Sequence, residues 1–286
     1  MSNLVWIDGQ RVPLDQAKIS VFDHGLLYGD GVFEGLRQYN GRIFRVQEHL
    51  DRLFDSARAI RLEIPYSPSE LLRAMEETLT ANGLRESYIR LVVTRGVGLL
   101  GISPASCQRP SVFIITDTIQ MYSAELYRTG MAIITASTVR TAPNALSPKI
   151  KSLNYLNNIL AKWEAIDAGV PEAVMLNHLG YVCECTGDNI FIVRRGTLMT
   201  PPPESGLLMG ITRGVVLELA DKAGILTQQT NLLRSDLYTA DECFLTGSGA
   251  EVIAVTSIDQ RPIGSGKVGP VTEQLSAAFH HYARHG

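Results

Sequence analysis

The stretch that decides the fold lies near the N-terminus and reads Val32-Phe33-Glu34-Gly35-Leu36-Arg37-Gln38-Tyr39-Asn40-Gly41-Arg42-Ile43-Phe44-Arg45. Asn-Gly is a strong signal for a two-residue turn, so the residues on either side of it are predicted to pair as strands. Over residues 45–60, apolar side chains recur at positions 46, 50, 53, 54, 57 and 60, which is the spacing of one helix face. The sequence therefore predicts a β-hairpin followed directly by an amphipathic helix.

The whole chain of 286 residues is long enough for about two domains. We expect a small α/β domain over residues 1–118, a loop without clear periodicity over 119–131, and a larger domain over 132–286. The first part has the further expected elements 6–13 (a hairpin), 67–81 (a helix), 88–94 and 111–116 (strands). The second has expected strands at 132–136, 173–177, 190–193, 242–245 and 252–258, and expected helices at 153–168, 212–223 and 272–283.

The composition excludes several classes of protein. Apolar residues make up 45% and charged residues 19%, with a net charge of −3. This balance argues against a nucleic-acid-binding surface. No apolar run approaches the roughly 18 residues of a membrane span, and the N-terminus has no signal-peptide pattern. We expect a cytoplasmic globular protein.

The four cysteines are too few for a disulfide framework. Cys183 and Cys185 are predicted to share one face of a strand, but no second ligand pair stands at a spacing suited to zinc. We therefore expect no metal site and small buried thiols in a reducing compartment.

One motif suggests a nucleotide site by its letters alone. Gly96-Val97-Gly98-Leu99-Leu100-Gly101 matches G-x-G-x-x-G, which binds a dinucleotide when a helix opens directly after it. Pro104 and Pro110 follow instead, and proline breaks a helix. The motif is better interpreted as a glycine-rich loop between two strands, with a nucleotide-binding module as the alternative.

Two lysines precede an expected helix. Lys149 and Lys151 alternate in a stretch that looks extended, so we expect them to share a face. A lysine held in a pocket can act as a Schiff-base nucleophile. The alternative is that both amines are solvated.

Glu184 lies among small and apolar residues in a strand-like run. A buried carboxylate needs a partner or it takes up a proton, and a protonated pyridine nitrogen is one suitable partner. The alternative is a glutamate that faces water at a strand end.

Two segments could bind an anion through backbone N–H groups and hydroxyls. Thr212 or a neighbour is expected to cap a helix whose first N–H groups favour a phosphate. The loop Thr246-Gly247-Ser248-Gly249-Ala250 allows close backbone approach and carries two hydroxyls. Arg52 is expected on the exposed side of its helix unless another element covers it, and a phosphate at a domain junction would give it a buried role.

Taken in order along the chain, these pieces resemble the fold type IV aminotransferases that use pyridoxal 5′-phosphate (PLP), and most closely the branched-chain group. The resemblance spans nearly the whole chain. It rests on Tyr28-Gly29-Asp30-Gly31-Val32-Phe33-Glu34-Gly35-Leu36-Arg37, His49-Leu50-Asp51-Arg52-Leu53, Tyr88-Ile89-Arg90, Lys151, Glu184-x-x-Gly187-Asp188-Asn189, Gly210-Ile211-Thr212-Arg213 and the Thr246 loop.

The resemblance implies a two-domain α+β fold, with a small α/β N-terminal domain and a larger PLP-binding pseudo-barrel domain, and a role for each matched residue. Lys151 is similar to the lysine that bonds to PLP and moves the proton, and Glu184 to the carboxylate that pairs with the pyridine nitrogen. Tyr155 resembles the residue that binds the cofactor's phenolic oxygen. The phosphate-binding positions match Arg52, Ile211, Thr212 and Ser248.

The resemblance also implies a dimer and a substrate site. The matching pocket positions are Phe33, Gly35, Tyr88, Arg90, Tyr122, Gly249 and Ala250, with Tyr28 and Ile102 contributed by the neighbouring subunit. The implied reaction is ping-pong transamination of leucine, isoleucine and valine with 2-oxoglutarate. Two alternatives stay open: a D-amino acid aminotransferase, which the short Lys151-Ser152-Leu153-Asn154-Tyr155 spacing also resembles, and an aminodeoxychorismate lyase.

Overall fold

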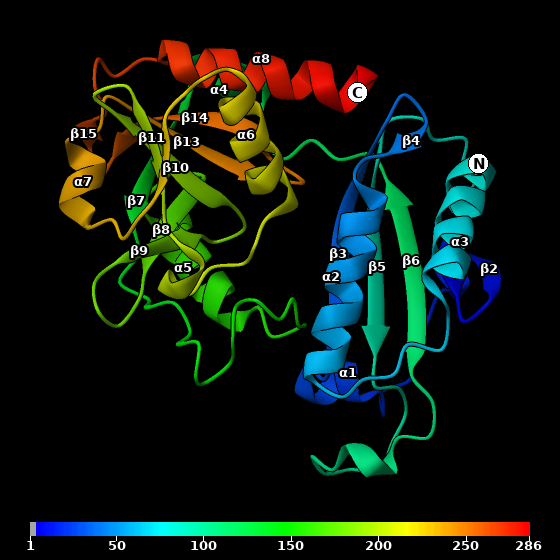
Figure 1. Ribbon diagram of the computed structural model, residues 1–286. Coiled ribbons are helices and arrows are strands. Elements are labelled where there is room, and N and C mark those ends of the chain that lie inside the picture. The colour runs from blue at the N-terminus through cyan, green and yellow to red at the C-terminus, as the bar shows by residue number, and fades with distance from the viewer. Residues whose placement is uncertain (1–3) are drawn as a thin grey trace. The chain divides into compact units, whose positions relative to one another are not determined.

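The computed structural model describes residues 4–286, which form two compact units (Figure 1). The N-terminal unit comprises Met1–Ile119 and Ile150–Asn154, and the C-terminal unit comprises Gln120–Lys149 and Tyr155–Gly286. The α+β fold class predicted from the sequence is confirmed.

The N-terminal unit is built on one antiparallel sheet with the strand order β2-β1-β6-β5-β3-β4. Its strands are β1 (Leu4–Ile7), β2 (Gln10–Pro13), β3 (Gly31–Tyr39), β4 (Arg42–Ile43), β5 (Ser87–Thr94) and β6 (Ser111–Asp117). Its helices are α1 (His24–Tyr28), α2 (Val46–Ala59) and α3 (Pro68–Ala81).

The predicted hairpin and helix are both present. Asn40 and Gly41 have φ values of 51° and 84°, as the tight turn between β3 and β4 requires. Helix α2 begins one residue after Arg45, and Leu50, Leu53 and Ala57 are buried on the face that the periodicity predicts. Helix α3 begins with a capping box in which Ser67 and Glu70 each bond to the other's backbone N–H.

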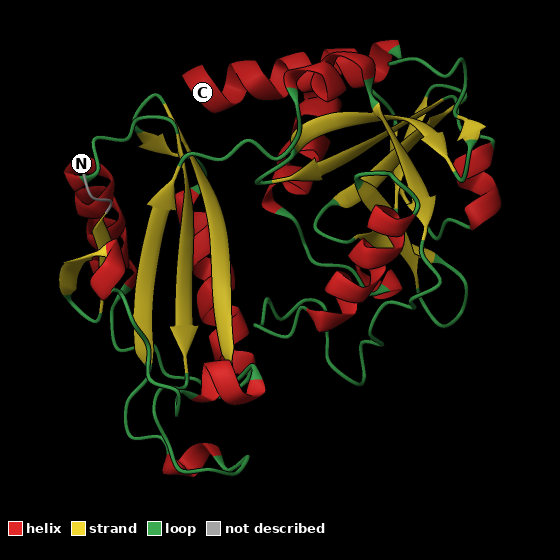
Figure 2. Ribbon diagram, turned by 180° about the vertical axis from the view of Figure 1, so that it is seen from behind, coloured by secondary structure: helices red, strands yellow, loops and turns green. Residues whose placement is uncertain are grey.

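Helices α2 and α3 cover the same face of this sheet. Alternate residues of the central strands point toward them and form the apolar core, because successive strand side chains point to opposite faces. The core-facing residues of β3 and β5 are Val32, Leu36, Ile89, Leu91 and Val93. Figure 2 views the unit from the side that neither helix covers.

A short distant segment pairs with the start of β3. Phe33 donates its N–H to the Lys151 carbonyl at 3.0 Å, and Leu153 donates to the Gly31 carbonyl at 3.0 Å. The expected helix therefore begins at Leu156 rather than at residue 153, because residues 151–153 hydrogen-bond as an added strand. Residues 148–149 form a turn, so the prediction that Lys149 and Lys151 share an extended face is wrong.

The C-terminal unit contains a nine-stranded sheet with the order β12-β11-β10-β13-β14-β7-β8-β9, and β15 pairs with β14. Its strands are β7 (Met131–Thr135), β8 (Glu172–Leu176), β9 (Val182–Cys185), β10 (Asn189–Arg194), β11 (Thr197–Thr200), β12 (Thr227–Gln229), β13 (Glu242–Gly247), β14 (Glu251–Ile258) and β15 (Arg261–Pro262). Its helices are α4 (Ala124–Thr129), α5 (Leu156–Asp167), α6 (Ile211–Lys222), α7 (Arg234–Tyr238) and α8 (Pro270–His285).

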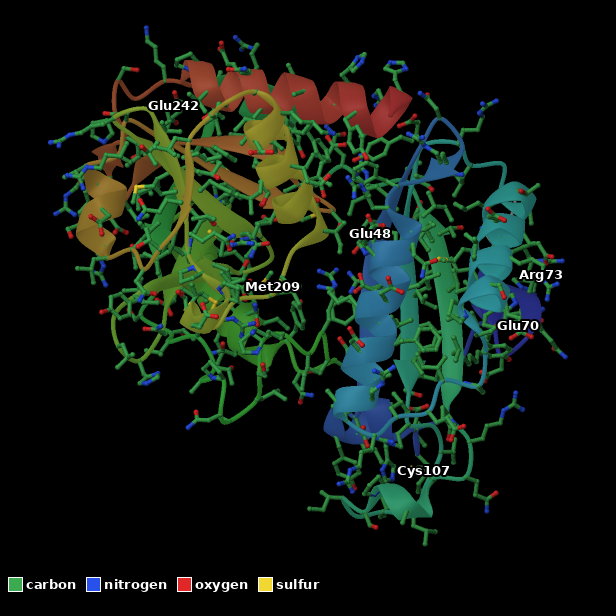
Figure 3. All side chains as sticks on the ribbon, in the orientation of Figure 1. Glu48, Glu70, Arg73, Cys107, Met209 and Glu242 are labelled. Carbon is green, nitrogen blue, oxygen red and sulfur yellow. The ribbon has the colours of Figure 1, made fainter. Side chains whose placement is uncertain are left out.

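One contact of this unit fixes the start of a helix, and another joins two strands. Glu242 of β13, labelled in Figure 3, accepts hydrogen bonds from the N–H groups of Val271 and Thr272 in the first turn of α8. Phe191 and Phe244 stack at 5.0 Å on paired positions of β10 and β13. The strands and helices expected after residue 131 are therefore present, with shifts of a few residues at their ends.

Sequence periodicity missed the shortest elements. Helix α4 lies in the stretch that we expected to be irregular, and Ser123 caps it by accepting the Leu126 N–H. Helices α1 and α7 have only five residues each, which is too short for a periodic pattern. Over residues 4–286, no helix combines the length and apolarity that a membrane crossing demands.

Candidate active site

The uncovered face of the N-terminal sheet carries an aromatic and cationic group of side chains. Phe33 and Gly35 of β3 lie opposite Val92 and Arg90 of β5, and Tyr88 lies two residues before Arg90 on the same face. The Arg90 guanidinium carbon is 4.5 Å from the centroid of the Phe33 ring and 5.5 Å from that of Tyr88. The pairing register of β3 and β5 thus brings four predicted substrate residues together.

Gly35 leaves room for the Tyr88 phenol. A Cβ atom at position 35 would lie 2.0 Å from the Tyr88 hydroxyl oxygen, which no real contact allows. Any larger residue at this position would force the tyrosine ring away from Arg90. The glycine therefore fixes the position of the aromatic side chain.

Lys151 lies on this face. Its Nζ atom is 4.6 Å from the centroid of the Phe33 ring, and its backbone N–H donates to the Ser56 hydroxyl at 3.1 Å. Lys149 is exposed whereas Lys151 is half-buried, so the two amines have different surroundings. Lys151 and Arg90 place two positive groups beside one ring, an arrangement that attracts a carboxylate.

Arg52 belongs to a buried charge cluster on the helix side of the sheet. Its Nε and Nη2 atoms donate to the two oxygens of Glu34 at 2.7 and 2.8 Å, and His49 Nδ1 donates to Glu34 at 2.7 Å. The Glu34 side chain is fully buried, and that of Arg52 is 12% exposed. The expectation that Arg52 faces water is wrong, because Glu34 points from β3 toward α2 and binds it.

The same cluster shifts two pKa values. Burial raises the pKa of Glu34, but the Arg52 charge and the hydrogen bonds from Arg52 and His49 outweigh burial and bring it down to about 2. Burial lowers the pKa of His49 more than the Glu34 carboxylate raises it. At neutral pH the cluster therefore consists of a carboxylate, a guanidinium and a neutral imidazole.

The glycine-rich loop contacts helix α1. His24 Nε2 lies 2.9 Å from the Leu99 carbonyl, and the Tyr28 hydroxyl accepts the Gly101 N–H at 2.8 Å. The loop leads from β5 into the 3₁₀ helix Pro104–Ser106 and then β6, so the prediction of a loop between two strands is confirmed. Tyr28 is 38% exposed and Ile102 is 84% exposed.

In the C-terminal unit, Glu184 is buried on β9 and bound on both oxygens. Arg140 Nε donates to one oxygen at 2.9 Å, and the Leu208 N–H donates to the other at 2.9 Å. Asn189 Nδ2 lies 3.4 Å from the second oxygen. The alternative of a glutamate facing water is wrong. The sequence reasoning missed Arg140, because no local pattern links residues 44 positions apart.

The start of helix α6 presents backbone donors. We expected Thr212 or a neighbour to cap this helix; the N-cap residue is the neighbour Gly210, which forms no side-chain cap. Thr212 is instead buried in the first turn. A Cβ atom at position 210 would lie 2.0 Å from Asn189 Oδ1, so glycine allows the helix start to approach this strand.

The Thr246 loop adjoins the same strand end. Thr246 pairs with Asn189 across β13 and β10, and its hydroxyl is buried without a hydrogen-bond partner among the described residues. Gly247 lies against Asp188, whose Oδ1 atom would be 2.0 Å from a Cβ at that position. The first turn of α6 and the Thr246–Ser248 segment thus flank Asn189. Their backbone donors and hydroxyls have the chemistry of an anion site.

The remaining predicted residues have varied surroundings. The Tyr122 hydroxyl lies 3.4 Å from Asp188 Oδ2 in the apolar core. Burial, followed by the Glu172 charge, raises the pKa of Asp188 to about 7. Ala250 is fully buried, Gly249 lies against the Met121 side chain, and Tyr155 is half-buried just before α5.

Comparison with known proteins identifies the family. The family model of amino-transferase class IV matches residues 31–258. This chain belongs to the class IV aminotransferases. A putative branched-chain-amino-acid aminotransferase of Methanocaldococcus jannaschii is 49% identical over 96% of this chain and 94% of its own length. The branched-chain-amino-acid aminotransferase of Pseudomonas aeruginosa is 40% identical over 96% of this chain and 91% of its own length.

Crystal structures of related proteins have the same fold as this aminotransferase. The crystal structure of the Escherichia coli branched-chain amino acid aminotransferase matches with a TM-score of 0.96 at 36% identity, over 99% of this chain and 95% of the other. A second branched-chain amino acid aminotransferase, solved with pyridoxamine 5′-phosphate, matches with a TM-score of 0.95 at 40% identity, over 99% and 94%. The expected fold type IV architecture is therefore confirmed.

Replacing Glu34 by Gln should destabilise the protein by about 3–5 kcal/mol at pH 7, because it leaves a buried guanidinium without its counter-charge. A carboxylate with a lowered pKa stabilises the fold above its unfolded pKa, and this contribution is lost as pH falls. The difference in the free energy of unfolding between Glu34→Gln and the unchanged protein should therefore become smaller as the pH falls from 4.5 toward 2.

Urea unfolding across this pH range checks the prediction. Glu48→Gln is the matched control, because Glu48 pairs with Arg45 at the surface and is worth about 1 kcal/mol or less. Equal stability of Glu34→Gln and the unchanged protein at pH 7 would contradict the account of the cluster.

Proposed function

We propose that this aminotransferase uses PLP to transaminate branched-chain L-amino acids, with Lys151 as the lysine that bonds to the cofactor. The observation that carries the proposal is the Lys151 amine 4.6 Å from the Phe33 ring, on the face that also holds Arg90. The branched-chain aminotransferases among the relatives support the substrate class.

The residues of this chain fit PLP chemically. The Thr246 hydroxyl, which has no partner within residues 4–286, and the first turn of α6, which has no side-chain cap, supply donors suited to a phosphate. Glu184, ion-paired to Arg140, offers a carboxylate to a pyridine N–H. We assign the phosphate to Ile211, Thr212, Ser248 and Arg52, and the phenolic oxygen to Tyr155. When bound, PLP supplies the electron sink that stabilises charge at the substrate α-carbon.

The protein's own groups supply the proton transfers. The Lys151 amine would remove the proton from the substrate α-carbon as general base and, as general acid, deliver it to the cofactor carbon within the same half-reaction; the second half-reaction would run the two transfers in reverse. Glu184 would accept the pyridine N–H, and Arg140 holds its carboxylate in place by donating to one oxygen at 2.9 Å. Gly35 and Tyr88 hold Arg90 and Phe33 in a fixed arrangement around the amine.

Arg90 and Phe33 give the substrate site two ways to select ligands. The Arg90 guanidinium would pair with the distal carboxylate of glutamate or 2-oxoglutarate, and Phe33 would contact an aliphatic side chain. One methylene distinguishes substrates by only about 1–3 kcal/mol, so leucine, isoleucine and valine should all react. Tyr88, Gly35, Tyr122, Gly249 and Ala250 complete the proposed pocket. The amino acid and the 2-oxo acid would use this one site in turn, and the first keto acid would leave before the second substrate binds, which makes the proposed mechanism ping-pong.

We further propose a homodimer in the cytoplasm. Each unit exposes apolar residues that a second copy could bury, and Tyr28 and Ile102 lie in the first of these two groups. The exposed groups are Leu26, Leu27, Tyr28, Val97, Leu99, Leu100 and Ile102, and, along α5, Leu156, Ile159, Leu160, Trp163 and Ile166. Exposed patches of this kind mark protein interfaces. Burial raises the pKa of the free thiols of Cys183, Cys185 and Cys243, which suits a reducing compartment.

Replacing Lys151 by Ala should abolish transamination, because it removes the amine that the proposal assigns to the cofactor bond and the proton transfers. Turnover of L-leucine with 2-oxoglutarate checks this, with Lys149→Ala as the matched control that keeps near-normal activity. Normal turnover by Lys151→Ala would refute the assignment.

A panel of L- and D-amino acids with 2-oxoglutarate should show that leucine, isoleucine and valine react within about 200-fold of one another. D-alanine should be slower than L-leucine, and a faster rate for D-alanine would establish the D-amino acid alternative. Pyruvate release from aminodeoxychorismate without a keto-acid acceptor would establish the lyase alternative.

Replacing Trp163 by Glu should shift the protein toward monomers, because the charge falls in an apolar face that the second copy covers. Analytical ultracentrifugation measures the change. Leu226→Glu is the control, since Leu226 is equally apolar and 69% exposed but lies outside both groups. A dimer of unchanged stability in Trp163→Glu would place the interface elsewhere.

A further inference from the structure

Arg213 is the largest fully buried side chain of the described residues, with 2% exposure. It lies in the first turn of α6, and its Nη2 atom donates to the Pro201 carbonyl at 3.0 Å and to Gln229 Oε1 at 2.8 Å. Both acceptors are neutral. The side chain therefore links the start of α6 to the end of β11 and to β12.

The guanidinium has no counter-charge within the described part of the chain. It forms no ion pair there, and its Nε atom is buried without an acceptor. Burial lowers its pKa, yet an arginine stays charged in proteins. Glu34 and Glu184, by contrast, are each ion-paired with an arginine. Burying a charge without a counter-ion costs several kcal/mol of folding free energy, so an anion near Arg213 would stabilise the protein.

The position of Arg213 makes the missing charge more pronounced. A helix N-terminus is the positive end of the helix dipole and favours an anion, so a cation in the first turn adds to an already positive site. On the neighbouring strand, the buried Thr246 hydroxyl also lacks a partner among the described residues, and Thr246 pairs with Asn189, which contacts Gly210. An unmatched cation and an unmatched hydroxyl thus lie at the two segments that flank Asn189.

We propose that Arg213 is a positioning residue whose buried, unmatched charge sets the affinity of the α6 N-terminus for a phosphate dianion. This inference rests on the proposed function, in which that dianion is the phosphate of PLP. Arg213 does not itself need to contact the phosphate. Its bonds to Pro201 and Gln229 hold the first turn of α6, and its charge offsets the dianion through the protein interior, where screening by water is weak.

The test compares PLP with pyridoxal, which has the same ring and aldehyde but no phosphate. Apoprotein is titrated with each ligand and binding is followed by absorbance. Replacing Arg213 by Met should weaken PLP binding by at least about tenfold, equivalent to about 1.4 kcal/mol, and leave pyridoxal binding within about twofold. Arg213→Lys, which keeps the charge, should retain most of the preference for PLP.

Two further variants keep the test decisive. Arg194→Met removes an arginine that pairs with Asp236 at the surface, and it should leave both affinities unchanged. Should Arg213→Met not fold, Arg213→Gln makes the same comparison, because its amide can still donate to the Pro201 carbonyl.

Each outcome bears on a different claim. An unchanged PLP-to-pyridoxal ratio in Arg213→Met would overturn the inference, and so would an equal loss of both ligands in the Met and Lys variants, which indicates a purely structural role. Failure of the unchanged protein to bind PLP at all would overturn the proposed function instead.

Discussion

Removing a charge from water is costly unless an opposite charge or hydrogen bonds stabilise it, and this constraint acts in both units of the protein. Glu34 meets Arg52 and the His49 N–H between β3 and α2, and Glu184 meets Arg140 beside β9. Each pair fixes an ionised group that solvent alone would leave mobile or allow to protonate. Arg213 departs from the pattern, because its buried guanidinium meets only neutral acceptors among the described residues.

The second organising feature is a sheet covered by helices on one face. Alternation along β3 sends Glu34 toward α2 and Phe33 to the opposite face. The ion pair of Glu34 and the candidate substrate residue Phe33 are thus neighbours in β3 but lie on opposite faces of the sheet. The pairing of residues 151–153 with the start of β3 then sets the Lys151 amine beside Phe33, although the two are far apart in sequence.

Local patterns in the sequence were sufficient for much of the fold. The Asn40-Gly41 turn, the apolar face of α2 and the loop at residues 96–101 follow from short-range rules, and the structure has all three. Short-range rules did not predict the surroundings of Arg52 and Lys149 or the partner of Glu184, because contacts between residues far apart in the sequence determine them. Arg140 belongs to no motif, and a contact with a residue 44 positions away brings it to Glu184. The family resemblance supplied residue roles that spacing alone left open.

The most direct test of the account is to find which lysine bonds to the cofactor. The protein incubated with PLP is reduced with borohydride, which makes the carbon–nitrogen bond permanent, and is then digested and mapped by mass spectrometry. The account predicts the phosphopyridoxyl label on Lys151 and its loss when the cofactor is first converted to its amine form with L-leucine. A label confined to Lys149, or a protein that takes up no label, would contradict it.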